Sequence, residues 1–287
     1  MNNNELNVGE ILLLKYIDGH ELPKSVPNYF EHYGVDFKKS IKKMFDNSYL
    51  EYAPLEYALS KRSVAELKSV LECESLPTKG KKDILVSRIL ENISHDRFKG
   101  FDTAYCLTTD KGKQIISEND HVFFFHDIYN RIGINIYDAD AYKMEHPTLS
   151  NVEIALNMLD DRKTKRAAEG KYSLVRNVYS EKAFVCYNNE RPLEALKHYC
   201  VVCCFDRLFS ESKAFCNMND FSKKYINRDL NSAVLRMLDE QLNENELVEY
   251  EGVISPVKEI ITAHNIPEST LKEYITEAIS EIAKYCK

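Results

Sequence analysis

The strongest constraint on this chain is a pair of helix signals separated by a proline and a basic turn. The first signal is a capping box, Ser63-Val64-Ala65-Glu66, in which the serine and glutamate side chains each accept a hydrogen bond from the other residue's amide. An apolar stripe at helical spacing follows, and Leu76-Pro77 ends the helix because proline has no amide hydrogen to donate. We expect Thr78 to cap a second helix beyond the turn at 79–82. Apolar residues recur at every fourth position of that helix, as Leu85, Ile89 and Ile93.

This pattern resembles the SAP module, a small helix–extended turn–helix unit found mainly in DNA- and chromatin-associated proteins. The residues that carry the resemblance are Val64, Leu67, Lys68, Leu71, Leu76-Pro77-Thr78, Gly80-Lys81-Lys82, Leu85 and Arg88. The matching stretch covers about a tenth of the chain. One departure is the acidic run Glu72-Cys73-Glu74, where members of the family often carry basic residues.

The resemblance implies that the basic turn contacts DNA. Its lysines lie at the start of the second predicted helix, where exposed amides and the helix dipole favour phosphate. The predicted DNA-binding residues of this module are Thr78, Lys79, Gly80, Lys81, Lys82 and Arg88. The turn is not a nucleotide-binding phosphate loop, because Gly80-Lys81 lacks the upstream glycine and the following Ser/Thr.

The segments on either side of this module predict a second known arrangement. Three helices are expected at 9–19, at 26–33 and from Asp36 onward, followed by a strand near 50–53. A returning strand is expected at 103–108, before a helix that begins in the run TDKGK. This order of elements resembles a winged helix-turn-helix. We therefore predict a winged-helix-like domain over 1–120, with the SAP-like module inserted at 60–95 in its wing hairpin.

The third predicted helix carries a lysine-rich face. Its lysines are Lys38, Lys39, Lys42 and Lys43, and its opposite, apolar face is formed by Phe37, Ile41, Met44 and Phe45. Such a face is more often a solvated surface than a recognition surface. Because a SAP-like turn is present, we include all four lysines in the predicted DNA-binding surface.

The C-terminal half is predicted to be helical. We expect a connecting segment at 121–150, whose apolar run His121–His126 is compatible with either a strand or a buried helix. Residues 172–188 and 193–209 form a predicted helical hairpin, with packing residues spaced as in a tetratricopeptide-like repeat: Ala183, Tyr187, Ala195, Tyr199 and Val202. One unit cannot form a solenoid, so 151–287 is predicted to be an α-helical, TPR-like bundle domain. Further helices are expected at 220–243, 255–264 and 268–286. The fold class is mainly α.

Composition narrows the class of protein. The formal charge of -7 argues against a general nucleic-acid coat protein, but residues 61–99 hold nine Lys/Arg against six Asp/Glu, so positive charge is local. The eight cysteines have no framework spacing, which favours free thiols in a reducing compartment. The sequence shows neither a signal-type N-terminus nor an apolar run of membrane-spanning length. We expect a cytoplasmic protein with no membrane partner.

Catalytic and metal sites are not predicted. The patterns HExxH and G-x-S-x-G and the phosphate loop do not occur in the sequence. Zinc is suggested by His198, Cys200, Cys203, Cys204 and Cys216. A Cys-x-x-Cys pair inside a helical run is, however, better explained as buried core. We expect no enzyme activity, no cofactor and no metal.

Two hypotheses for function follow. In the first, the chain is a DNA-binding accessory or regulatory protein, of a style typical of bacteria or phage. Its SAP-like turn and lysine-rich helix contact phosphate, and 151–287 binds a protein partner or a second copy of the chain. In the second, both modules are scaffolding, and the chain is an adaptor between proteins that binds no DNA. The sequence leaves both open.

Overall fold

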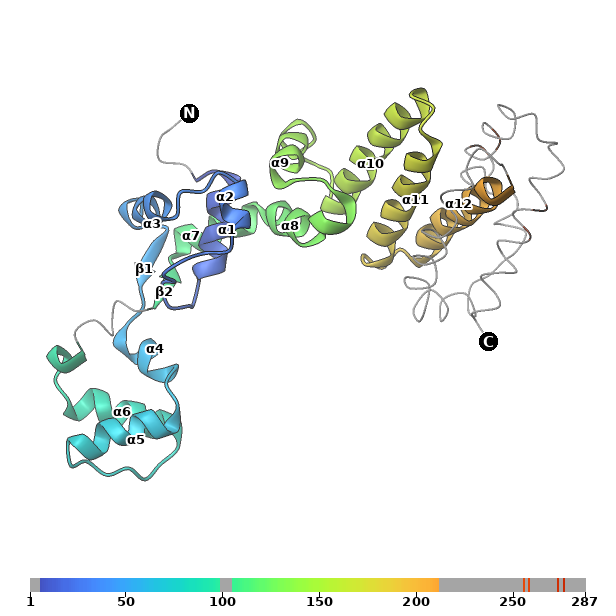
Figure 1. Cartoon of the computed structure of the whole chain (residues 1–287). Coiled ribbons are helices and arrows are strands. Elements are labelled where there is room, and N and C mark those ends of the chain that lie inside the picture. The colour runs from blue at the N-terminus through green and yellow to red at the C-terminus, as the bar shows by residue number, and fades with distance from the viewer. Residues whose placement is uncertain are drawn as a thin grey trace. The chain divides into compact units, whose positions relative to one another are not determined.

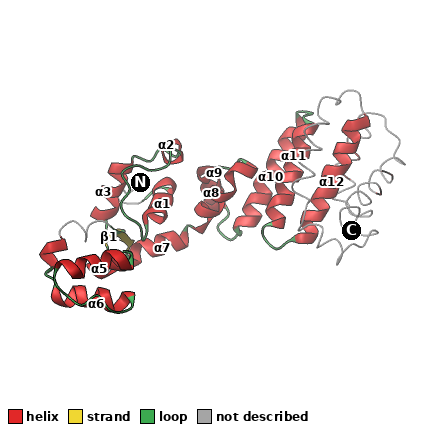
Figure 2. Cartoon of the chain, turned by 60° about the horizontal axis from the view of Figure 1, so that its bottom comes forward, coloured by secondary structure: helices red, strands yellow, loops and turns green. Residues whose placement is uncertain are grey.

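The computed structural model describes residues 6–98 and 105–211, with the single positions 255, 258, 273 and 276 (Figure 1). The chain divides into two compact units, Met1–His126 and Asp127–Lys287. The described residues are mainly α-helical, as predicted, and their strands form one small two-stranded sheet (Figure 2). None of the described helices combines the length and the apolar character needed to cross a membrane.

The first unit begins with three helices and a strand. The helices are α1 (Val8–Ile17), α2 (Tyr29–His32) and α3 (Phe37–Asp46), and the strand is β1 (Leu50–Tyr52). After a long insertion, β2 (Cys106–Thr108) pairs with β1 in antiparallel register, with Leu50 opposite Thr108, and α7 (Asp110–Glu118) follows. The predicted return strand is therefore present and pairs with the first strand. Residues 103 and 104 of that prediction lie outside the described residues.

The insertion between the strands folds around its own core. It contains α4 (Leu55–Ser60), α5 (Val64–Cys73), α6 (Lys82–Asn92) and the 3-10 helix η1 (His95–Phe98). The side chains that form this core are Leu55, Leu59, Leu67, Leu71, Leu85, Val86, Ile89, Ile93 and Phe98. Helix α4, which the sequence did not predict, belongs to this core and also reaches the rest of the unit, because the Tyr57 hydroxyl donates to the Gly19 carbonyl at 3.1 Å.

The start of α7 grips the turn that leads into β1. Thr109 caps α7 by accepting from the Gly112 amide at 3.1 Å, and its hydroxyl donates to the Ser48 carbonyl at 2.7 Å. Lys111 donates to the Asn47 carbonyl at 2.9 Å. A Cβ added at Gly112 would lie 2.3 Å from the Tyr49 carbonyl oxygen. The close approach of the α7 backbone to the turn explains why the run TDKGK has a glycine at position 112.

The second unit contains helices joined by short turns. They are the end of α8 (Asp120–Ile132), then α9 (Ile136–Glu145), α10 (Asn151–Ala168), α11 (Tyr172–Tyr187) and α12 (Pro192–Glu211). The predicted hairpin is present as α11 and α12, and α10 packs beside α11 (Figure 1). The predicted connecting segment 121–150 contains most of α8 and all of α9, so its apolar run at 121–126 is helical. The helices predicted at 220–243, 255–264 and 268–286 lie outside the described residues, apart from four single helical positions.

Ion pairs inside the second unit fix the helices against one another. Arg176 of α11 donates from Nε and Nη2 to the two carboxylate oxygens of Asp206 on α12, at 3.0 and 2.8 Å. Lys182 of α11 donates to Asp160 of α10 at 2.8 Å. Because a partly buried charge is costly unless it is paired, each pair favours one register between neighbouring helices.

We expect the Gly112→Ala variant to destabilise the first unit. The new methyl group meets the backbone of Tyr49, which cannot move without distorting the entry to β1. Overpacking of this kind typically lowers the free energy of unfolding by about 1–3 kcal/mol. Thermal unfolding followed by circular dichroism measures the loss. The control is Lys113→Ala in the same turn, where the side chain is exposed; equal melting of both variants would contradict the explanation.

The second unit should lose stability in acid through His198. Burial lowers the pKa of His198 to about 3, whereas an unfolded histidine titrates near 6.5. Between those two pH values the unfolded state binds a proton that the folded state does not. The free energy of unfolding therefore decreases as the pH is lowered, by on the order of 1.4 kcal/mol per pH unit.

The His198→Phe variant provides the comparison for this pH dependence. Burial raises the pKa of Glu181 and of Asp206, which opposes the histidine effect, but both carboxyls remain in the variant. The difference in urea unfolding between wild type and variant, measured from pH 7 to pH 4, therefore isolates His198. A difference that does not change with pH would contradict the prediction.

Candidate nucleic-acid interface

The basic turn is an extended segment between α5 and α6. Helix α5 ends at Cys73, and Ser75 adopts a positive φ of 57°. Helix α6 begins at Lys82, with the extended Lys81 as its N-cap. The predicted start at Thr78 is therefore wrong. Thr78 lies inside the extended turn because Gly80, with φ 143°, interrupts any helix at that point.

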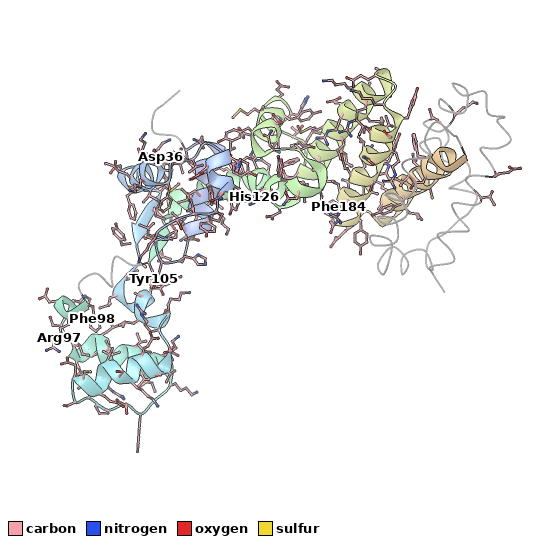
Figure 3. All side chains as sticks on the ribbon, viewed as in Figure 1. Asp36, Arg97, Phe98, Tyr105, His126 and Phe184 are labelled. Carbon is pink, nitrogen blue, oxygen red and sulfur yellow. The ribbon has the colours of Figure 1, made fainter. Side chains whose placement is uncertain are left out.

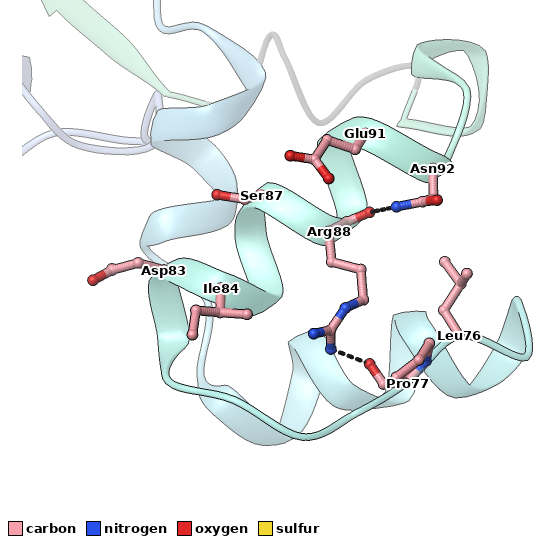
Figure 4. Close-up of a pocket in the computed structure, with 8 residues that line it drawn as sticks. All are labelled: Leu76, Pro77, Asp83, Ile84, Ser87, Arg88, Glu91 and Asn92. Carbon is pink, nitrogen blue, oxygen red and sulfur yellow. Dashed lines mark hydrogen bonds between the residues drawn. The ribbon is translucent and has the colours of Figure 1, made fainter.

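Arg88 holds this turn in place. From the middle of α6, its guanidinium donates to the Pro77 carbonyl (Figure 4). It also donates to the Lys79 carbonyl, at 3.1 Å. These bonds satisfy backbone oxygens that lie outside any helix or sheet. Arg88 stays a predicted DNA contact, and the structure shows that its guanidinium also holds the turn in position.

The glycine brings the turn close to the first turn of α6. A Cβ added at Gly80 would lie 3.0 Å from Cγ2 of Ile84, and its φ is one that L side chains rarely adopt. The neighbouring Lys79 and Lys81 are both exposed, while Lys82, the first residue of α6, is half-buried. Lys81 makes no side-chain cap to the α6 amides within the described structure. Two lysines and uncapped amides therefore lie together at one exposed helix start.

A shallow pocket of about 510 Å³ lies behind the turn. It is lined by Leu76, Pro77, Asp83, Ile84, Ser87, Arg88, Glu91 and Asn92 (Figure 4). Two of these side chains, Asp83 and Glu91, are acidic and exposed, and they disfavour a phosphate inside the pocket. An anion that approaches this module is thus directed to the lysine side of the turn.

The lysines of α3 form a separate basic element beside β1. Lys38 is exposed, and so are Lys39 and Lys42. Lys39 pairs with Asp36 at 3.3 Å, and Lys42 pairs with Asp46 at 2.5 Å. Asp36 also caps α3 by accepting from the Lys39 amide at 3.2 Å (Figure 3). Exposed pairs of this kind contribute little stability, so these ammonium groups can exchange their carboxylate for a phosphate.

Lys43 does not belong to that exposed surface, contrary to the prediction. Its ammonium lies 2.8 Å from Glu10 of α1, a carboxylate whose residue is only 7% exposed. The Ser40 hydroxyl donates to the other oxygen of Glu10 at 3.1 Å. Lys43 therefore joins α3 to α1 by compensating a buried charge.

The cysteine-rich part of α12 is packed in the helical core. Cys200 and Cys204 are fully buried, and burial raises the pKa of the Cys200 thiol. Within the described residues, no group of three or more His, Cys, Asp or Glu side chains is arranged to hold a metal ion. The side chain of Cys203 and all of Cys216 lie outside the described part of the chain.

Residues 58–94 match the family model for the SAP domain. The match confirms the predicted SAP module. It begins within α4, in agreement with the core that α4 shares with α5 and α6. Comparison with curated proteins and with solved structures found no match for the chain.

The positioning role of Arg88 predicts a specific effect of the Arg88→Met variant. The variant keeps most of the apolar stem but loses both bonds to the turn, so the free energy of unfolding should fall by about 1–3 kcal/mol. Hydrogen exchange at the Leu85 amide, which donates to the Lys81 carbonyl where the turn meets α6, should become faster at the same time.

Lys68→Met on α5 is the control, because Lys68 is an exposed cation of the same module. It should change neither stability nor exchange at the Leu85 amide. Unchanged exchange in Arg88→Met, together with a loss of DNA binding, would instead make Arg88 a direct contact.

Proposed function

We propose that this SAP-domain protein is a non-enzymatic accessory or regulatory protein that binds the phosphate backbone of duplex DNA. SAP domains are DNA-binding modules, and residues 58–94 match that family. The observation that carries the proposal is the turn at 79–82, in which two exposed lysines flank Gly80 at the uncapped start of α6. Helix starts of this kind attract phosphate through their amides and their dipole.

The proposed contacts are electrostatic and read little sequence. The turn offers ammonium groups and amides, which bind phosphate oxygens rather than base edges. Each phosphate that is neutralised releases counterions, so affinity should fall steeply with salt. The net charge of -7 for the whole chain confines the interaction to this local basic surface.

The remainder of the first unit is proposed to be a winged-helix-like domain with the SAP domain in its wing. The order α1–α2–α3–β1, then β2–α7, supports this proposal. Lys38, Lys39 and Lys42 on α3 add a second basic element, and the paired Lys43 is not included. The helical second unit, which we propose to be TPR-like, is assigned to a protein partner or a second copy of the chain. We place the protein in the cytoplasm.

An adaptor that binds no DNA is the second candidate. It is favoured by the use of Arg88 to hold backbone carbonyls, and by the acidic side chains of Asp83 and Glu91 beside the turn. In this case the SAP domain serves as a structural unit, and the chain joins proteins to one another.

Binding to short duplex DNA across a salt series distinguishes the two candidates. We expect fluorescence anisotropy to show micromolar binding that weakens steeply as salt increases. The Lys79→Glu/Lys81→Glu variant should abolish it. A single Lys81→Gln change removes one positive charge and should reduce the slope of log K against log salt by about one.

The control variant is Lys165→Glu/Lys171→Glu in the second unit, which changes net charge by the same amount at two exposed positions. It should retain most of the affinity. If both double variants lose affinity equally, the turn acts only through the net charge of the chain and is not the binding site. If the wild type does not bind DNA at low salt, the adaptor function is favoured.

A further inference from the structure

An aromatic pair with one half-buried and one exposed ring lies at the end of α3, which also carries the lysines. The rings of Phe45 and Tyr52 stack with their centroids 4.5 Å apart and their planes 33° from parallel. Tyr52 is 48% exposed, although it follows a buried leucine by two positions in β1. About half of Tyr52 is thus open to a ligand.

Helical spacing places this pair beside positive charge. Lys38, Lys42 and Phe45 follow one another at i, i+4 and i+7, so they lie on one face of α3. Phe45 lies at the edge of that face, where it meets the core residues Ile41 and Met44. The exposed ring of Tyr52 thus extends a strip that already carries two exposed ammonium groups.

Acidic neighbours do not cancel this charge. Asp46 is paired with Lys42, and both side chains are more than half exposed, so a phosphate can compete for the lysine. Glu51 is next to Tyr52 in β1, but successive strand residues point to opposite faces. The strip therefore combines the flat ring of Tyr52 with two cations that lie about one and two helical turns from Phe45 along α3.

We propose that Tyr52, stacked on Phe45, is a platform for an unpaired base of single-stranded DNA, with Lys38 and Lys42 on the flanking phosphates. Sites for single strands combine positive charge along the backbone with aromatic rings on which bases stack. A base within duplex DNA has no free face to offer, so the platform favours unpaired over paired DNA. The inference rests on the proposed function for its class of ligand and for Lys38 and Lys42, whereas Tyr52 and Phe45 take no part in the proposed duplex binding and lie outside the SAP domain.

The test compares a labelled single strand of about 15 nucleotides with a duplex of the same length by fluorescence anisotropy. Tyr52→Ile keeps a high strand propensity and an apolar side chain next to Phe45, but removes the flat ring. We expect it to weaken single-strand binding about 5- to 100-fold and to leave duplex binding unchanged. Tyr52→Phe, which keeps the ring, should bind like wild type.

Two further variants make the outcome decisive. Tyr129→Ala removes an equally exposed tyrosine of the second unit and should have no effect. The Lys79→Glu/Lys81→Glu variant should lose duplex binding, while adding Tyr52→Ile to it should still weaken single-strand binding. Failure of the proposed function and failure of the platform therefore give different results. Equal single-strand affinity of wild type and Tyr52→Ile, with both proteins folded by circular dichroism, would overturn the platform.

Discussion

The antiparallel pairing of β1 with β2 is the constraint on which the first unit depends. The two strands are only three residues long, and residues 53–105 separate them in sequence. Closing such a loop costs conformational entropy that a three-residue ladder does not recover. The insertion removes much of this cost because it folds on its own core, from Leu55 to Phe98. The grip of α7 on the turn before β1 then fixes the strands from the other side, through Thr109 and Gly112.

The conformational entropy of the backbone also matters in the basic turn. A turn with no helix or sheet bonds of its own would sample many conformations, and its lysines would have to be ordered when a ligand binds. Arg88 removes that freedom by donating to two carbonyls of the turn, and Gly80 permits the backbone angle that this arrangement needs. The backbone that carries Lys79 and Lys81 is then held in one conformation, while their side chains stay exposed. Preorganisation of this kind raises affinity by lowering the entropy lost on binding.

Local patterns predicted much of this fold because their physics is local. The Ser63–Glu66 capping box and the hairpin of α11 and α12 depend on residues a few positions apart, whereas the stop predicted at Leu76-Pro77 comes three residues earlier, at Cys73. Other features depend on partners far along the chain. The sequence places Lys43 among exposed lysines, because its partner Glu10 lies on another helix. No local pattern in the sequence shows that the Arg88 guanidinium reaches the Pro77 carbonyl. Phe45 was assigned to an apolar face, as its spacing indicates, but its stacking on Tyr52 requires β1 to pack against α3.

The SAP turn and the strip on α3 and β1 lie in the same unit but have different chemistry. Together they would select a ligand that neither surface selects alone. In the function proposed above, the SAP turn binds phosphates through amides and ammonium groups, and in the further proposal the strip on α3 and β1 stacks a base. When one DNA molecule engages one surface, the second event becomes intramolecular, with an effective concentration that reaches the millimolar range for a short connection. Two weak sites can then discriminate strongly between ligands, because only DNA that carries a duplex next to unpaired bases satisfies both. Such a ligand would be selected by its structure rather than its base sequence, as expected for contacts made to phosphate and to the faces of bases.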